Sequence, residues 1–307
     1  MIINNRIYYI MNISLVIPCI PEDHDSLIKV IDAYKNGSIQ PNEYIISYSN
    51  CSKQDSKKLD DLEAMFSNIN LKLLRVDQLL NRAENRNNGA KYAKWDIISF
   101  NDADDIPHPQ RIEIIKYCFD NYNIDALLHS YLLSECIGKS IDHCTFCRRK
   151  SINIFEHYDL NNLSLIHDNI VRQLTFPSSD ILPNVKSIIA FNGEKQINIH
   201  HGHISIKKKV FDKVKFNRKF IRGQDSLFCQ NVLYEGYKVA VVDANLLIYT
   251  SNWQPKDDDF FKVNINDKTI IVDIGNRTPP KPALPMTKQE IDIKLETIKK
   301  YLESLLS

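Results

Sequence analysis

The feature that most constrains the fold is a regular alternation of apolar runs and amphipathic segments through the first hundred residues. Four short apolar runs predict buried strands, and they occupy residues 13–17, 44–48, 71–76 and 95–100. The segments between them repeat apolar side chains at helical spacing, over residues 25–37, 55–66 and 83–93. This β-α-β-α-β-α-β order demands right-handed crossovers, so we expect an α/β, Rossmann-like fold with a mainly parallel central sheet flanked by helices.

An acidic cluster begins within two residues of the end of the fourth predicted strand. In the stretch NDADD, Asp102, Asp104 and Asp105 follow one another closely. Ligands of parallel sheets bind beyond the carboxyl ends of the strands, so the cluster lies at the ligand-binding edge. A solvated turn is the alternative, because Asp is favoured in turns. If the backbone is extended, Asp102 and Asp104 project to one side and can hold one cation, whereas Asp105 points elsewhere.

Two glycine-rich loops that commonly bind phosphates are absent from the sequence. The turn after the first predicted strand reads PCIPEDHD, and neither G-x-G-x-x-G nor G-x-x-x-x-G-K-[ST] occurs. A protein that binds phosphates without such a loop needs another source of positive charge. A divalent cation held by carboxylates, Mn²⁺ or Mg²⁺, is the obvious source.

The overall charge balance gives no general field for an anionic partner. Lys plus Arg number 39 and Asp plus Glu number 38, so we expect neither nucleic acid nor an anionic membrane as a partner. With 43% hydrophobic and 25% charged residues, the chain has the composition of a soluble globular protein. Recognition of a specific ligand must therefore depend on a local binding site rather than on the overall charge.

The sequence predicts a cytoplasmic protein. Its first residues carry no secretory signal pattern, and no apolar run approaches the length of a membrane span. Seven scattered cysteines, an odd number, fit reduced thiols. Ile, Asn and Lys are abundant, as in A+T-rich genomes of large DNA viruses or low-G+C bacteria, and for a viral chain the compartment is the host cytoplasm. Cys144 and Cys147 have zinc-like spacing, but no second pair completes four ligands.

Several segments, in order, resemble the GT-A-fold glycosyltransferases of the family 2 type. The first predicted strand ends in I-P, a predicted helix carries Arg86-Asn87-Asn88-Gly89, and the fourth strand leads into D-x-D-D. Residues 201–249 are similar to the second half of that family, with a glycine, a basic segment and the pair Gln224-Asp225. Together the similar segments cover roughly 150 of the residues between 11 and 250.

The resemblance implies a metal-dependent enzyme of the hexosyltransferase type. Residues 1–260 are then a GT-A domain, in which 11–105 bind the nucleotide, 106–260 bind the acceptor, and 130–200 form a variable segment. A sugar would move from a nucleotide-diphosphate donor, with UDP-sugars favoured, to a hydroxyl of a glycan, protein or small molecule. Asp102 and Asp104 match the D-x-D that binds Mn²⁺ or Mg²⁺, and the reaction inverts the anomeric carbon.

The family's other functional positions carry over residue by residue. Asp225 matches the base that takes the proton of the acceptor hydroxyl, although a helix N-terminal Asp stabilised by the helix dipole is the alternative. His201 and His203 flank a matching glycine, and they are either substrate contacts or ordinary strand histidines. The positions that match donor-binding residues of the family are Pro18, Ile20, Glu22, Ser49, Arg86, Asp102 and Gly202.

Two departures from the family pattern leave alternatives open. After the second predicted strand, Ser49 and Asn50 stand in the region where the family commonly has two Asp residues, one of which reads the nucleobase. The stretch 248–253 lacks the His that many relatives use as a third metal ligand. These departures support the alternative of a catalytically inactive sugar-nucleotide or glycan-binding relative, whereas the intact D-x-D and Asp225 argue against it. A nucleotidyltransferase is a further alternative, but it normally carries a glycine-rich basic loop that this chain lacks.

Residues 261–307 are predicted to be a C-terminal extension. Four prolines between residues 279 and 285 form a stiff linker, and Thr287 with Glu290 makes a capping box. The helix that follows has one apolar stripe, formed by Ile291, Leu295, Ile298, Leu302 and Leu305. We expect this amphipathic helix to pack on the domain, with homodimerisation as the alternative.

Overall fold

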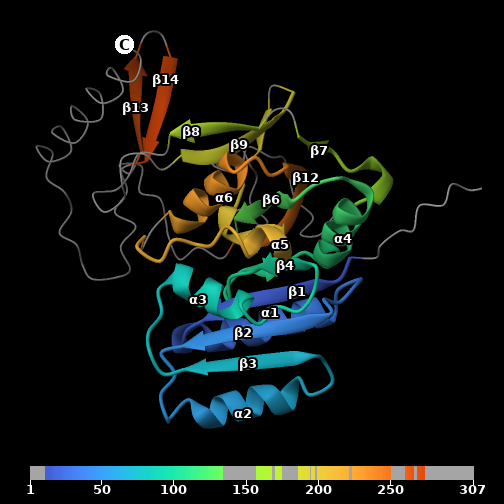
Figure 1. Ribbon diagram of the computed structural model, residues 1–307, viewed down its shortest axis with the longest axis vertical. Coiled ribbons are helices and arrows are strands. Elements are labelled where there is room, and N and C mark those ends of the chain that lie inside the picture. The colour runs from blue at the N-terminus through green and yellow to red at the C-terminus, as the bar shows by residue number, and fades with distance from the viewer. Residues whose placement is uncertain are drawn as a thin grey trace, which may run out of the picture. The chain divides into compact units, whose positions relative to one another are not determined.

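Figure 1 shows a computed structural model of the chain, which describes residues 11–133, 157–167, 170–174, 186–193, 195–197, 199–220, 223–249, 260–265 and 268–273. Its contacts divide the chain into two compact units, Met1–Gln173 with Lys186–Ser251 and Leu174–Val185 with Asn252–Ser307. In the second unit, β13 (Phe260–Ile265) and β14 (Lys268–Asp273) form an antiparallel hairpin. Three sequence predictions lie outside the described residues, namely the Cys144–Cys147 pair, the proline-rich linker and the C-terminal amphipathic helix.

The alternation predicted for the first hundred residues is confirmed. Four strands run parallel, and they are β1 (Ile13–Cys19), β2 (Glu43–Ser49), β3 (Leu71–Val76) and β4 (Ile97–Phe100). The helices between them are α1 (His24–Lys35), α2 (Ser56–Met65) and α3 (Arg82–Ala90). The spatial order β3-β2-β1-β4 places β1 next to β4, with Val16 opposite Phe100, so the acidic cluster follows β4 beside the last residues of β1.

The same sheet continues with strands from later in the chain. These strands are β6 (Ala126–Leu133), β11 (Ser205–Lys207) and β12 (Val239–Tyr249), with the short β5 (Ile106–Pro107) and β7 (Leu165–Ile166) on β12. β11 is antiparallel to both β4 and β6, whereas β6 and β12 run parallel. Six strands of this nine-stranded sheet therefore point the same way, and β5, β7 and β11 point the opposite way. The prediction of a mainly parallel sheet is confirmed.

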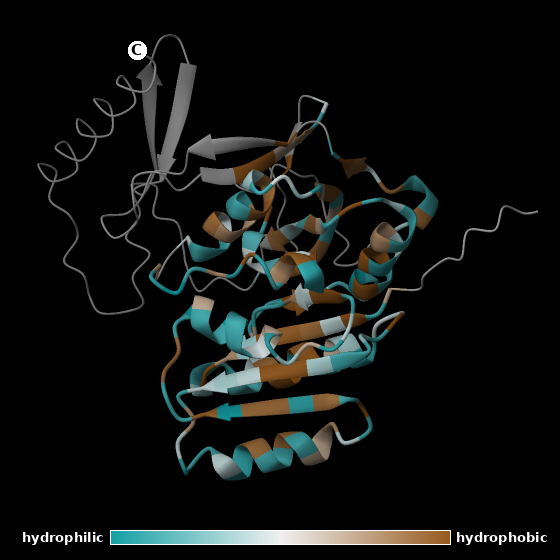
Figure 2. Cartoon of the chain, viewed as in Figure 1, coloured by the Kyte–Doolittle hydropathy of each residue, from teal (hydrophilic) through white to brown (hydrophobic). Residues whose placement is uncertain are grey.

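Helices cover both faces of this sheet and enclose two apolar layers. One layer receives side chains from α1, α2 and α4 (Arg111–Asn121), and the other from α3, α5 (Lys208–Phe211) and α6 (Gln224–Tyr234). Along β1, Leu15 and Ile17 face the first layer and Val16 faces the second, as the two-residue period of a strand requires. In Figure 2 hydrophobic residues are frequent along the strands, whereas α2 and α3 are largely hydrophilic.

Three further strands form a smaller sheet, in the order β10 (Lys195–Ile197), β9 (Lys186–Asn192) and β8 (Ile170–Leu174). Strand β9 contacts α6, one of the helices that cover the nine-stranded sheet. None of the helices that the structure describes combines the length and the hydropathy needed to cross a bilayer.

Helix α3 is polar, yet it is fixed tightly to the sheet. Its start is a capping box, in which Asn81 accepts a hydrogen bond from the Glu84 N–H at 3.0 Å. A Cβ on Gly89 would lie only 2.5 Å from Val16 Cγ1, so only glycine allows this close approach to β1. Asn88 donates to the Ser47 hydroxyl at 2.8 Å. These contacts fix the rotation of α3 and hence the direction of its arginines.

Candidate active site

The acidic segment after β4 forms a turn. The Asp105 N–H donates to the Asp102 carbonyl at 3.3 Å, and the Asn101 side-chain amide donates to the carbonyls of Asp102 and Asp105 at 2.7 and 2.8 Å. Because a turn brings residues i and i+3 together, Asp105 approaches Asp102. The extended backbone considered from the sequence, which pairs Asp102 with Asp104, is therefore wrong for this segment. A metal-binding role for Asp104 stays a prediction.

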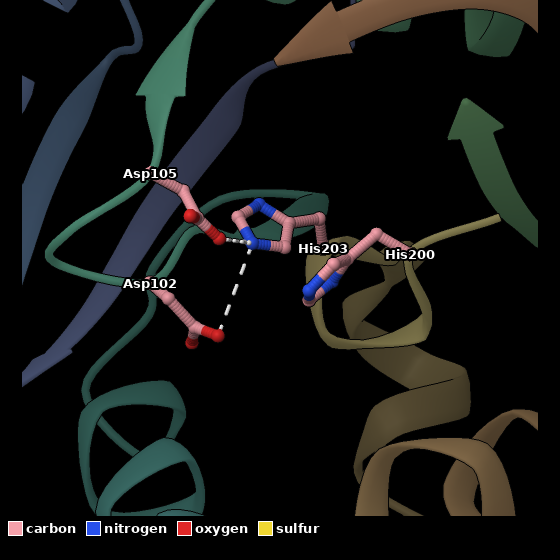
Figure 3. Close-up of side chains that lie close together, drawn as sticks. All are labelled: Asp102, Asp105, His200 and His203. Carbon is pink, nitrogen blue, oxygen red and sulfur yellow. Dashed lines mark hydrogen bonds and ion pairs between the residues drawn. The ribbon is translucent and has the colours of Figure 1, made fainter. Parts of the chain in front are cut away.

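Four side chains converge beside this turn, as Figure 3 shows. Asp102, Asp105, His200 and His203 each offer one ligand atom, and these atoms lie within 4.8 Å of one another. The His203 Nε2 atom is 2.7 Å from Asp105 Oδ2 and 3.9 Å from Asp102 Oδ2. Asp105 and His203 are fully buried, whereas the Asp102 side chain keeps 25% of its exposure. Carboxylate oxygens and imidazole nitrogens together suit divalent ions of the first transition series.

The sheet topology explains how the histidines reach the acidic turn. His203 ends the short 3-10 helix His201–His203, directly before β11. β11 is antiparallel to β4 with Ser205 opposite Ser99, so the residues that precede β11 lie beside those that follow β4. The Phe100 N–H donates to the Ile204 carbonyl at 3.1 Å and continues this pairing.

Burial keeps both histidines in the neutral form. Desolvation lowers the pKa of His203 to about 3, although the charge of Asp102 acts in the opposite direction. Desolvation, and then His203, lowers the pKa of His200 to about 4. Within the described part of the chain, the Nδ1 atoms of both rings have no hydrogen-bond partner. A neutral imidazole offers a nitrogen lone pair, so both rings are suited to bind a metal at neutral pH.

Aromatic rings hold His200 in place. Its ring centroid lies 4.3 Å from that of His203, 4.9 Å from Tyr249 and 5.6 Å from Tyr131. Tyr131 and Tyr249 stand near the carboxyl ends of β6 and β12. Tyrosine side chains from β6 and β12 thus pack against the His200 ring and support it.

Like charges crowd the acidic side of the site. Burial, and then the charges of Asp105, Asp102 and Asp23, raises the pKa of Asp104 to about 7. Burial and the charge of Asp102 also raise the pKa of Asp23, which follows β1. A bound cation would relieve this repulsion, because an opposite charge favours the ionised form of a carboxylate.

Arg86, Asp102 and Gly202, three residues predicted from the sequence, come together. The Arg86 guanidinium, whose side chain is 2% exposed, forms an ion pair with Asp102 and lies over the Phe216 ring. Burial alone would raise the pKa of Asp102, but Arg86 and His203 outweigh it and lower this pKa. A Cβ on Gly202 would lie 2.9 Å from Arg86 Nη2, so glycine leaves room for the guanidinium.

Asp225 lies in the first turn of α6, which contacts α3. Its Oδ1 accepts a hydrogen bond from the Ser226 N–H at 2.9 Å. Burial alone would raise the pKa of Asp225, but His201 and Arg86 lower it, so the carboxylate is ionised. An ionised carboxylate can accept a proton, and the catalytic role of Asp225 stays a prediction.

The two histidines that flank Gly202 differ in their contacts. The His201 ring nitrogen Nε2 lies 3.0 Å from the Ile188 carbonyl and 3.1 Å from the Ile188 N–H, so it binds the backbone of β9. His203 belongs to the group of four side chains beside the acidic turn. His201 is thus engaged by the fold, whereas His203 faces the candidate site.

The residues predicted to bind the nucleotide lie at the carboxyl ends of β1 and β2 and in the segment that follows β1. Pro18 is near the end of β1, Ile20 and Glu22 follow it, and Ser49 ends β2. Asn85 on α3 joins the ends of these two strands, because its amide donates to the Cys19 carbonyl at 3.1 Å and to the Ser49 hydroxyl at 3.2 Å. Their roles in donor binding stay predictions, and this bridging asparagine was not recognised from the sequence.

Helix α3 also holds the loop that leads to Asp225. The Asn87 side-chain amide donates to the Phe216 carbonyl at 2.8 Å, and the Phe216 N–H donates to Asn87 Oδ1 at 3.1 Å. One asparagine therefore satisfies both backbone groups of Phe216. Each residue of the R-N-N-G segment, Arg86 to Gly89, thus makes a contact that fixes α3 against a neighbouring segment.

Arg111 is a buried residue of the site that sequence reasoning missed. It is fully buried, and its Nη2 donates to the carbonyls of Phe100 at 2.9 Å and His203 at 3.1 Å. Its Nη1 donates to the Tyr34 hydroxyl, and its Nε donates to His129 Nε2 at 3.2 Å. Arg111 thereby ties the end of β4 to the histidine segment. The sequence carries no signal for this, because Arg111 reads as an ordinary arginine in the first turn of a helix.

The fold and this site define the class of GT-A-type glycosyltransferases. The family model for glycosyl transferase family 2 matches residues 14–167, and the chain belongs to this family. An uncharacterized glycosyltransferase of Methanocaldococcus jannaschii is 22% identical over 241 residues, which are 77% of this chain and 70% of that relative.

Two solved structures match the chain, and the one with a TM-score above 0.5 has a similar fold. A mannosyltransferase from Pyrobaculum calidifontis, in complex with GDP-Man and Mn²⁺, has a TM-score of 0.51 at 12% identity, over 79% of this chain and 57% of that one. S. aureus TarS 1-349, in complex with UDP-GlcNAc, has a TM-score of 0.49 at 14% identity, over 80% of this chain and 60% of that one. The chain thus spans less than two thirds of either structure.

Proposed function

We propose that this family 2 glycosyltransferase moves a sugar from a nucleotide-diphosphate donor to a hydroxyl acceptor, with a divalent cation and with inversion at the anomeric carbon. The observation that carries the proposal is the convergence of Asp102, Asp105, His200 and His203 at the ligand-binding edge of the sheet. Asp225 and Arg86 lie close enough to interact electrostatically. A group of side chains that could hold a cation, a candidate base and a guanidinium thus occupy one region.

The donor set favours Mn²⁺ over Mg²⁺. Asp102, Asp105, His200 and His203 would hold the ion, and Asp104 is a further candidate ligand. Imidazole nitrogens suit transition ions, whereas Mg²⁺ is bound mainly through oxygen atoms. When bound, the cation supplies positive charge that stabilises the departing nucleoside diphosphate.

The chain's own residues account for the remaining steps. Asp225 is ionised and takes the proton of the acceptor hydroxyl as its oxygen attacks the anomeric carbon. One displacement of this kind inverts the anomeric configuration. Two nitrogens of the buried Arg86, Nε and Nη1, have no hydrogen-bond partner among the described residues, which supports a role in binding the donor.

UDP-sugars are the first candidates for the donor, and GDP-mannose is the second. The first choice follows from the family resemblance of the segment from Pro18 to Glu22 at the end of β1. The second is supported by the GDP-Man complex of the Pyrobaculum mannosyltransferase, whose fold is similar. Ser49 stands where relatives often carry a base-reading Asp, so both nucleobases belong in the test.

A donor screen tests the proposal. The full chain is incubated with UDP- and GDP-linked sugars in Mn²⁺, Mg²⁺ or EDTA, and nucleoside diphosphate release is measured. We expect release that requires the metal and is lost in Asp102→Asn, while the surface variant Asp60→Asn behaves as wild type. Thermal unfolding shows whether each variant is folded. Absence of release with every donor, together with absence of Mn²⁺-dependent nucleotide binding, would overturn the proposal.

A further inference from the structure

Arg82 is the first residue of α3, one helical turn before Arg86. Residues four apart share a face of a helix, and Arg86 on this face binds Asp102. Arg82 extends the face from that buried ion pair to the surface, because its side chain is exposed. Since α3 contacts α6, the same face lies near the helix that begins with Gln224 and Asp225.

Carboxylates on two sides influence the Arg82 guanidinium. Desolvation alone would lower the pKa of Arg82, but the charges of Asp102 and then Asp225 outweigh it and raise this pKa. In turn, Arg82 is among the positive charges that lower the pKa of Asp102. The positive charge of Arg82 therefore interacts with a carboxylate of the candidate cation site and with the carboxylate of the candidate base.

The guanidinium of Arg82 makes no ion pair or hydrogen bond with any residue that the structure describes. The other arginines of the sheet and its helices are engaged, because Arg75 pairs with Asp60 and Glu63, and Arg86 pairs with Asp102. Arg111 makes four hydrogen bonds in the core. Among the described arginines of the sheet and its helices, Arg82 alone combines a guanidinium without an ion pair or hydrogen bond with a position next to the site.

The backbone that carries Arg82 is fixed. Asn81 caps the helix, and its side-chain amide also donates to the Arg218 carbonyl at 2.9 Å. Gly89 packs the other end of α3 against β1. A planar guanidinium on a rigid helix is well suited to bind phosphate oxygens through paired hydrogen bonds.

We propose that Arg82 binds the phosphate that joins the sugar to the donor nucleotide, and that it stabilises the charge that this phosphate gains. The inference rests on the proposed function. During transfer, the bond between the anomeric carbon and the phosphate oxygen breaks, and its electron pair stays on that oxygen. The acceptor oxygen bonds to the anomeric carbon and its proton passes to Asp225, while Arg82 stays protonated throughout.

The test compares nucleoside diphosphates with monophosphates, which lack the phosphate in question. Affinities for UDP, UMP, GDP and GMP are measured by calorimetry in Mn²⁺ for wild type, Arg82→Gln, Arg82→Lys and the control Arg75→Gln. We expect Arg82→Gln to lose about tenfold in diphosphate affinity and to keep its monophosphate affinity. Arg82→Lys should recover part of the loss, because it keeps the charge but not the forked geometry. Arg75→Gln should match wild type.

Kinetics give an independent readout. With the donor found in the screen, kcat of Arg82→Gln should fall by about 10²-fold, because the lost interaction strengthens as charge develops. An unchanged ratio of diphosphate to monophosphate affinity in Arg82→Gln, with transfer intact in wild type, overturns this inference and leaves the proposed function standing. Equal loss of both nucleotides, the mark of a structural role, also overturns it. Wild type that binds neither diphosphate overturns both proposals.

Discussion

The two halves of the central sheet contribute to the site in different ways. In the half made of β1–β4, each strand is joined to the next by a helix, and the half supplies Asp102, Asp105 and the arginines of α3. In the half made of β6, β11 and β12, neighbouring strands come from distant parts of the chain. The segment before β11 supplies His200 and His203, and the first turn of α6 supplies Asp225. The acidic turn and the arginines of α3 thus come from the locally built half, whereas the imidazoles and the candidate base come from the half assembled over long range.

The largest expected effect separates the halves by function. In Asp225→Asn, transfer should fall by about 10³-fold or more, because the acceptor proton loses its base. Mn²⁺-dependent binding of nucleoside diphosphate should stay within a few-fold of wild type, since the first half is intact. Activity assays and calorimetry on the same preparation check both statements. A comparable loss of nucleotide binding would show that Asp225 serves the donor side instead.

The next prediction concerns Arg111, which is hydrogen-bonded to residues of both halves. Arg111→Met should lower the free energy of unfolding by about 3 kcal/mol, because several buried hydrogen-bonding groups lose their partner. Urea denaturation measures this change. The surface variant Arg75→Met removes two exposed ion pairs and should cost about 1 kcal/mol or less. Equal effects of the two substitutions would contradict the central position given to Arg111.

A third prediction tests whether the second half helps to hold the ion. His203→Gln should weaken Mn²⁺ binding by about 10- to 100-fold, measured from the electron paramagnetic resonance signal of free Mn²⁺. His201→Gln is the matched control, because the His201 ring binds the backbone of β9 rather than the acidic turn. If both variants bind Mn²⁺ as wild type does, the acidic turn holds the ion by itself.

The smallest effect concerns the contact between the halves at Gly202. Gly202→Ala places a Cβ 2.9 Å from Arg86 Nη2, so the guanidinium must shift away from its position. We expect about tenfold lower kcat/KM with little change in stability, because a small displacement in a site is costly for catalysis. Steady-state kinetics and thermal unfolding check the two parts. Unchanged kcat/KM would mean that Arg86 tolerates the added methyl group.

The comparison of the halves also explains what the sequence could predict. The strands β1–β4 and the positions of Asp102 and Arg86 follow from short-range periodicity and adjacent motifs, so they were accessible. The partner of Asp102 was not, because Asp105 approaches it only through a turn closed by Asn101. His203 reaches the cluster through an antiparallel register between Ser205 and Ser99, and no local pattern encodes that pairing. The buried network of Arg111 depends on packing from several elements and has no sequence signature.

The two hydrogen bonds between the Asn87 side chain and the Phe216 backbone have a consequence for how the enzyme can vary over evolution. Asn87 contacts the backbone of the loop rather than its side chains, so the loop's position does not depend on which residues it carries. The neighbouring Asn217, Arg218 and Lys219 are exposed and are free to be replaced. Substitutions can therefore accumulate at these exposed positions without moving α3, and the Asp102–Arg86 contact that α3 makes is kept while the surface of the loop changes.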